Sequence, residues 1–221
     1  VVDRRDDPFN PTRGLYASLA ADTTPSSVLP DSPAFGRAIG RVVGLIPFGD
    51  QGFGLQLEAG GGVLWSYDGE LAPVEWRFRL GGTSTVRGYR IDSIGPSGLR
   101  SGALQDLGLL SSTHADRRVA VGGNAFYRYS VQFQFPLPFV ADWRLVVFHD
   151  AGNALLYGDV PDGIHSSRAP PLHATFGIGL RRITPIGPLR LDVAFRPEQF
   201  DDAGRIALGE LVQVHFAVGA L

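Results

Sequence analysis

Histidines, carboxylates and arginines are the residues of this 221-residue chain that could take part in chemistry, and their spacing excludes most enzyme sites. The chain has no cysteine, which rules out disulfides, thiolate metal sites and a cysteine nucleophile. None of its histidines occurs in an HExxH or similar pattern, and neither GxSxG nor a P-loop is present. Ser130, His149 and Asp150 suggest a catalytic triad, but adjacent residues of a strand point to opposite faces. We therefore expect no enzyme, no metal site and no other cofactor.

Arg87 is the cation that stands out, because it lies in a polar, glycine-rich segment that follows a strand-like stretch. A planar guanidinium can bind a carboxylate through two parallel hydrogen bonds, and shielding from water strengthens such a pair. Gly88 allows a tight turn or close packing, and Tyr89 can stack beside it. The residues alone leave two interpretations open: an arginine that makes an internal contact, or a solvated loop arginine.

Composition restricts the kind of protein further. The net charge is −2 with a pI near 6.2, so no basic surface for nucleic acid is indicated. The 29 glycines and 16 prolines favour turns over long helices. No apolar run reaches the roughly 18–20 residues that a membrane helix needs. Any membrane-spanning part must therefore consist of strands in a barrel.

Alternation of apolar and polar residues is the main structural signal. In 125–135 the odd positions are almost all aromatic or aliphatic, and most even positions are polar. Several such stretches have about ten residues, the length of a tilted membrane strand. Their polar faces carry arginines and carboxylates, which a wet lumen accommodates and a soluble core does not. Nine strands are predicted, at 14–22, 36–47, 53–66, 74–80, 125–135, 143–150, 172–182, 188–197 and 210–218.

The pattern predicts which face of the last two strands meets lipid. The expected lipid-facing residues are Leu189, Leu191, Val193, Phe195, Val212, Val214 and Phe216. A water-soluble β-sandwich also alternates and remains the alternative.

Four short segments occur in a fixed order along the chain. They are Val86-Arg87-Gly88-Tyr89, Val121-Gly122-Gly123-Asn124-Ala125, Phe148-His149-Asp150-Ala151-Gly152-Asn153 and Thr184-Pro185-Ile186-Gly187-Pro188-Leu189. This set resembles the C-terminal barrel of the outer-membrane protein assembly factors, the BamA/TamA type. The resemblance covers nearly the whole chain, from Pro11-Thr12-Arg13-Gly14 to the last strand.

The resemblance implies an all-β fold, a transmembrane antiparallel β-barrel. About nine strands match the C-terminal part of a sixteen-stranded barrel, and single-chain bacterial barrels have an even number of strands. Residues 1–221 would form a single membrane-barrel section, with a long in-folding loop at about 81–120 and no POTRA domain. We expect N-terminal strands and POTRA domains elsewhere, or a second chain, because an open sheet edge in hydrocarbon is costly.

The resemblance also implies two groups of site residues. In the family the in-folding loop meets an aspartate on the inner wall, so Arg87, Gly88 and Tyr89 would form a latch with Asp150. Gln132 stands where the family often has a glutamate, and its neutral amide supplies less attraction. The last strand would pair weakly with the first and form a seam, through Gly209, Val212, Val214, Phe216 and Gly219.

The implied function is the assembly and insertion of other β-barrel proteins. The expected partners are outer-membrane lipid and nascent outer-membrane β-barrel proteins, with no nucleic acid. The expected location is the outer membrane of a Gram-negative bacterium. Two alternatives remain, a polypeptide export pore of the two-partner secretion type and a passive porin.

Overall fold

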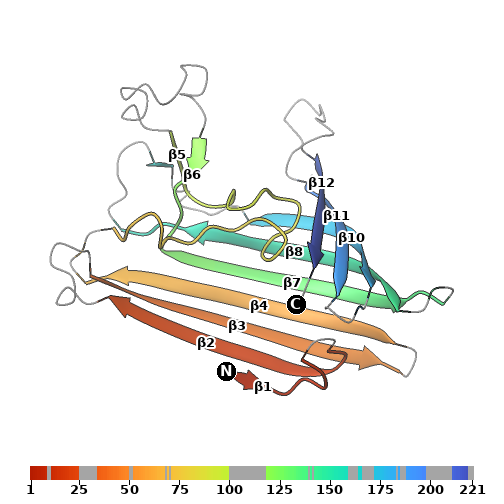
Figure 1. Ribbon diagram of the computed structural model, residues 1–221. Coiled ribbons are helices and arrows are strands. Elements are labelled where there is room, and N and C mark those ends of the chain that lie inside the picture. Colours follow the sequence, from red (N-terminus) through yellow and green to blue (C-terminus); the bar gives the residue numbers. More distant parts are fainter. Residues whose placement is uncertain are drawn as a thin grey trace.

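The computed structural model describes most of the chain, and its regular structure is one large curved antiparallel sheet (Figure 1). The described residues are 1–8, 11–24, 34–49, 52–67, 69, 71–99, 118–138, 140, 142–158, 164–165, 172–182, 184, 188–197 and 211–218. The sheet contains β1 (Val2–Asp3), β2 (Gly14–Thr24), β3 (Phe35–Phe48), β4 (Phe53–Ser66), β7 (Ala125–Pro136), β8 (Trp143–Leu155), β10 (His173–Arg182), β11 (Leu189–Phe195) and β12 (Val212–Val218).

Neighbouring strands follow the chain in the order β1-β2-β3-β4-β7-β8-β10-β11-β12. The predicted all-β class and the count of nine strands are confirmed. In the described part of the chain, no helix is long and apolar enough to cross a bilayer.

The sheet is open in the described residues. Its last strand is β12, as predicted, but its first edge differs from the prediction. The predicted first edge, 14–22, is covered over two residues by β1, which pairs Val2 with Ala17 and Asp3 with Tyr16. At the other edge, the described ladder of β12 is with β11. Between β1 and β12 these residues form no ladder. The last strand therefore presents an edge without a ladder in this part of the structure.

The predicted strand at 74–80 is wrong. Backbone hydrogen bonds from Trp76 to Pro73 and from Arg77 to Val74 make turns there, and only isolated bridges follow. Phe78 and Leu80 are buried against other apolar side chains, whereas Val74 and Trp76 are exposed. The alternation in this segment thus reflects packing of an in-folded loop rather than a strand between water and lipid. The ninth strand of the sheet is instead β1.

The two faces of the sheet differ as the alternation predicts. On β11 and β12 the residues predicted to meet lipid are exposed or half-buried, and Val214 and Phe216 are 65% and 66% exposed. The opposite face carries buried or half-buried arginines and acids, among them Arg181, Asp192 and Glu58. Charged groups on the inner, concave face and apolar groups on the outer face are the distribution of a membrane barrel.

The Pro11-Thr12-Arg13-Gly14 segment forms the connection that leads from β1 into β2. The Asp6 carboxylate accepts hydrogen bonds from the Thr12 hydroxyl and from the backbone N–H groups of Thr12 and Arg13. These bonds, that of the Thr12 hydroxyl foremost, hold the pKa of Asp6 below its usual range. The ionised side chain fixes the point where β2 begins.

A second, small sheet joins two of the loops at one end of the large sheet. It contains β5 (Ser97–Leu99), β6 (Arg118–Ala120) and β9 (Ile164–His165), in the order β6-β5-β9. Strands β5 and β6 belong to the connection between β4 and β7, and β9 belongs to the connection between β8 and β10 (Figure 1). The in-folded loop is therefore tied to its neighbouring loop.

Val214 and Gln213 test the assignment of the faces, because they are neighbours on β12 that point to opposite sides. Val214→Arg should lower the free energy of unfolding by about 2–4 kcal/mol, since the cation would enter hydrocarbon. Gln213→Arg should change it by no more than about 0.5 kcal/mol, because the side chain stays on the wet face. Urea unfolding in lipid vesicles measures both values. Equal losses would indicate a water-soluble sheet.

Candidate functional site

The segment from Leu71 to Ile94 lies on the concave side of the large sheet, and the chain then leads to β5 at the end of the sheet (Figure 1). Leu80, Val86, Tyr89 and Ile94 of this segment pack together, and Val86 has no exposed surface. Burial of this apolar cluster favours the in-folded position. Of the loop predicted at about 81–120, residues up to Ile94 supply this buried cluster, and 97–99 and 118–120 belong to the small sheet. Residues 100–117 lie outside the described residues.

The start of β7 anchors this segment through the Gly122-Gly123 pair. Phe78 and Gly123 exchange two backbone hydrogen bonds of 2.8 and 2.9 Å. A Cβ on Gly123 would run into the backbone of Leu155 on β8, so only glycine permits this approach. The double glycine therefore allows the loop and two strands to meet at one point.

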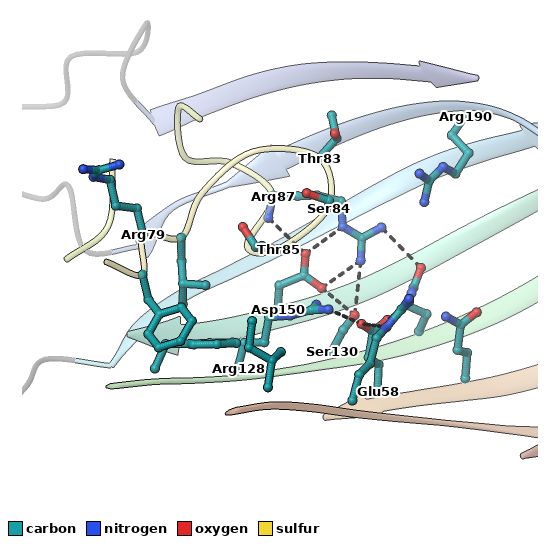
Figure 2. A pocket seen from close by; sticks show the side chains of 17 residues that line it. Glu58, Arg79, Thr83, Ser84, Thr85, Arg87, Arg128, Ser130, Asp150 and Arg190 are labelled. Carbon is teal, nitrogen blue, oxygen red and sulfur yellow. Dashed lines mark hydrogen bonds and ion pairs between the residues drawn. The ribbon is translucent and has the colours of Figure 1, made fainter. Parts of the chain in front are cut away.

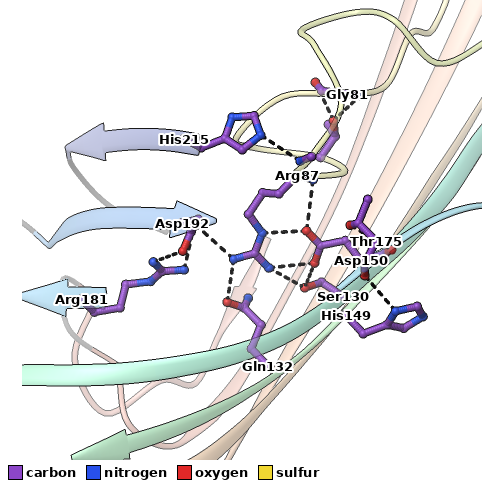
Figure 3. A network of polar contacts seen from close by, with 12 residues as sticks. Gly81, Arg87, Ser130, Gln132, His149, Asp150, Thr175, Arg181, Asp192 and His215 are labelled. Carbon is purple, nitrogen blue, oxygen red and sulfur yellow. Dashed lines mark hydrogen bonds and ion pairs between the residues drawn. The ribbon is translucent and has the colours of Figure 1, made fainter. Parts of the chain in front are cut away.

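Arg87 and Asp150 form a buried bidentate ion pair (Figure 3). The guanidinium donates from Nε to Asp150 Oδ2 at 2.6 Å and from Nη2 to Oδ1 at 2.7 Å. The Arg87 backbone N–H also donates to Oδ2, at 3.2 Å. Only 4% of Arg87 and 1% of Asp150 is exposed. The aspartate thus fixes both the side chain and the backbone of the loop tip.

The remaining donors of Arg87 meet three other polar groups. Nη1 lies 3.2 Å from Gln132 Oε1 and 3.4 Å from Asp192 Oδ2. Nη2 lies 3.3 Å from Ser130 Oγ, which itself donates to Asp150 at 2.6 Å. The guanidinium carbon lies 3.5 Å from the centre of the Phe148 ring, a cation–π contact.

Gly88 and Tyr89 fit the wall beside the ion pair. Gly88 has a φ of +90°, and an added Cβ would come within 3.0 Å of Thr175 and 3.1 Å of Ala194. Tyr89 is buried, with the Arg196 guanidinium over its ring at 5.1 Å and His173 edge-on at 5.5 Å. At position 88, both the positive φ and the small space beside Thr175 and Ala194 require glycine.

A cavity of about 430 Å³ lies beside the ion pair, between the loop and the inner face of β3, β4 and β7 (Figure 2). The Glu58 carboxylate lines this cavity. It accepts a hydrogen bond of 2.8 Å from Nε of Arg41 and another from Nη2 of Arg128. The described polar face is therefore cross-linked by ion pairs on both sides of the cavity.

The structure brings together the five residues predicted for the latch: Arg87, Gly88, Tyr89, Asp150 and Gln132. The seam residues Val212, Val214 and Phe216 lie apart from them, on the outer face of β12. Gly209 and Gly219 lie outside the described residues, as do Pro185, Ile186 and Gly187 of the fourth segment.

His149 does not join Ser130 and Asp150, as strand geometry required. Its ring meets the Tyr129 hydroxyl and the Thr175 carbonyl, and it stacks on Phe176 at 4.4 Å.

Sequence reasoning missed Ser130, Asp192, Phe148 and His215 as contacts of the loop. Ser130, Asp192 and His215 occupy the polar alternating positions of their strands, and Phe148 is two residues before Asp150. Alternation therefore placed all four side chains on the inner face. Nothing in the sequence indicated which inner residues the loop tip would reach.

Comparison with known proteins identifies the fold family. Residues 1–220 match the model of the Omp85 superfamily domain. The chain belongs to this superfamily.

A crystal structure of BamA from Haemophilus ducreyi lacking POTRA domains 1–3 superposes with a TM-score of 0.70 at 24% identity. The superposition covers 99% of this chain and 40% of that one. This likeness supports the fold.

Two curated proteins also belong among its relatives. The chain is 28% identical over 197 residues to a SAM50-like protein of Schizosaccharomyces pombe. This match covers 86% of the chain and 37% of that protein. It is 29% identical over 194 residues to the chloroplastic outer envelope protein 80 of Arabidopsis thaliana, covering 87% of this chain and 20% of that protein. The chain therefore spans well under half the length of these relatives.

Removing the cation should break the latch. We predict that Arg87→Ala lowers the free energy of unfolding by about 3–5 kcal/mol, because Asp150 would remain charged and buried without its partner. Arg90→Ala is the matched control, since Arg90 is exposed in the same loop. Denaturant unfolding in detergent measures both, and similar losses for the two variants would contradict a buried latch.

Adding one methyl group at the loop tip should also be harmful. Gly88→Ala places a Cβ at a positive φ and against Thr175 and Ala194, so we expect a loss of about 1–3 kcal/mol. Gly69→Ala is the control for the angle alone, because Gly69 also has a positive φ but open space around it. Thermal unfolding compares them. A loss for Gly88→Ala no larger than that for Gly69→Ala would show that close packing is unimportant.

Proposed function

We propose that this barrel section assembles and inserts other β-barrel proteins into an outer membrane. Membership of the Omp85 superfamily supports a role at such a membrane. The observation that carries the proposal is the edge of β12, which has a ladder only with β11 in the described residues. An exposed edge offers a row of N–H and C=O groups to an incoming strand.

The outer face of β12 fits the same proposal. Val212, Val214 and Phe216 alternate along the strand and face outwards, where lipid would lie. A client strand that pairs with this edge continues the apolar surface and satisfies its backbone groups before it leaves the template. The affinity comes from main-chain hydrogen bonds, so clients need no common sequence. No catalytic residue, nucleotide or metal is required by this mechanism.

The location and partners belong to the same proposal. We place the chain in the outer membrane of a Gram-negative bacterium, in contact with lipid and with nascent outer-membrane β-barrel proteins. Its sheet closes with further strands, and POTRA domains stand beside it, in the same polypeptide or in a second chain. Cell fractionation tests the location, and the mass of the barrel extracted in detergent tests whether more strands are present.

An export pore of the two-partner secretion type is the second candidate, because a latched loop inside the barrel also suits a gated channel. A passive porin is the third, and the buried ion pair in its lumen argues against it. The three differ in product. Client barrels in vesicles end up in the bilayer for an insertase, whereas an export pore delivers unfolded polypeptide across it and a porin passes only small solutes.

Cysteine crosslinking tests the edge directly, because the chain has no native cysteine. Val214→Cys should form a disulfide with a cysteine in the last strand of a client during assembly in cells. Leu57→Cys is the control, since it also faces outwards but lies on β4, which is paired on both sides. Crosslinks of equal yield at both positions, or none at Val214→Cys while clients are still inserted, would refute templating by β12.

A further inference from the structure

The tip of the in-folded loop contacts the edge strand itself. The backbone N–H of Gly88 donates to Nε2 of His215 at 2.8 Å (Figure 3). His215 lies in the middle of β12, on the inner face and half-buried. Since Nε2 accepts this hydrogen bond, the imidazole is neutral and carries its proton on Nδ1. The residue next to Arg87 is thus joined to the strand that forms the edge.

Asp192 makes a second connection at the same level of the sheet. It pairs with His215 across the β11–β12 ladder, and both side chains point inwards. Its carboxylate binds Arg181 of β10 and, at 3.4 Å, Nη1 of Arg87. It is 4% exposed, so water does little to weaken these contacts.

Asp192 also supplies a negative charge to Arg87, which β7 does not, because β7 has no acidic residue. On that side of Arg87 the partner is the neutral amide of Gln132. The two carboxylates around the guanidinium are therefore Asp150 on β8 and Asp192 on β11. The loop tip bridges the middle of the sheet and its last hairpin.

Steric fit prevents the tip from sliding between these contacts. Gly88 lies where an added Cβ would touch Thr175 of β10, Ala194 of β11 and Arg196 just after β11. The hydrogen bond to His215 is therefore made in a position fixed by β8, β10 and β11. Movement of β12 away from this position breaks the bond, and withdrawal of the loop removes it from β12.

We propose that His215 and Asp192 are positioning residues that couple the Arg87 latch to the edge strand β12. The latched loop holds β12 in place, and release of the loop frees β12 to move. The coupling is reciprocal, so loosening β12 also loosens the loop tip. In insertion, this coupling would control when β12 can move, and that role rests on the proposed function. The coupling itself can be measured without a client.

Hydrogen exchange of the folded protein in detergent tests the coupling. His215→Leu should speed exchange of the amides of residues 86–89 by roughly two- to tenfold, the effect of one lost hydrogen bond. Gln213→Leu is the matched control on the same strand and face, and it should leave the loop unchanged. His215→Gln should restore slow exchange, because its amide oxygen can accept from Gly88. A loop that exchanges equally in all variants overturns the proposal.

The reverse direction uses variants that keep β12 intact. Arg87→Ala and Asp192→Asn should each speed exchange in residues 212–218 more than in residues 39–43 of β3. This arm decides the matter if His215→Leu does not fold. Uniform acceleration in both strands would indicate general loss of stability and would overturn the coupling.

Client insertion is measured separately with the same variants. If loop and strand are coupled in exchange but clients insert equally with His215→Leu and the wild-type protein, coupling stands and its role in insertion fails. If exchange shows no coupling, the inference fails whatever the clients do.

Discussion

The arrangement of the rest of the molecule depends on the buried ion pair of Arg87 and Asp150. A guanidinium and a carboxylate removed from water are tolerated only when their hydrogen bonds are well satisfied, and a pair that loses one partner is strongly destabilising. Strands far apart in the sequence meet this requirement here. Ser130, Gln132 and Asp192 accept hydrogen bonds from the donors of Arg87 that Asp150 does not use. The sheet must therefore keep the curvature that brings its inner face around the loop tip.

Much of the large sheet follows from alternation, and its exceptions have physical causes. The predicted ranges of β3, β4 and β7 differ from the observed bounds by one residue at most, because lipid on one side and a wet interior on the other enforce a period of two. The segment 74–80 alternates for a different reason, since Phe78 and Leu80 enter clusters formed inside the sheet. Short β1 has too few residues to show any period. A pattern of alternation thus identifies two unlike environments but does not say that one of them is lipid.

The candidate site was predictable to the extent that it depends on local residues. Arg87 and Asp150 were expected to meet because their surrounding segments resemble those of a family with such a contact. Asp192 and His215 could not be found in this way, since their proximity to the loop depends on the register of β10, β11 and β12 and on how far the sheet curls. Parity assigns a side chain to the inner face, but only curvature decides which inner side chains share a neighbour.

The connection between β4 and β7 has a consequence for how the chain folds. Every other pair of neighbouring strands in the large sheet is joined by a shorter segment, so those hairpins can form from nearby residues. Pairing β4 with β7 instead requires closing the longest loop, an entropic cost that comes before any contact is gained. That same loop carries Phe78, which shares an apolar cluster with Phe35 and Leu64 of β3 and β4. It also carries Arg87, which binds Asp150 of β8. Pairing of β4 with β7 and filling of the interior are therefore linked. A chain with the loop left outside would keep the β4–β7 ladder but lose the apolar clusters and the ion pair on the concave side.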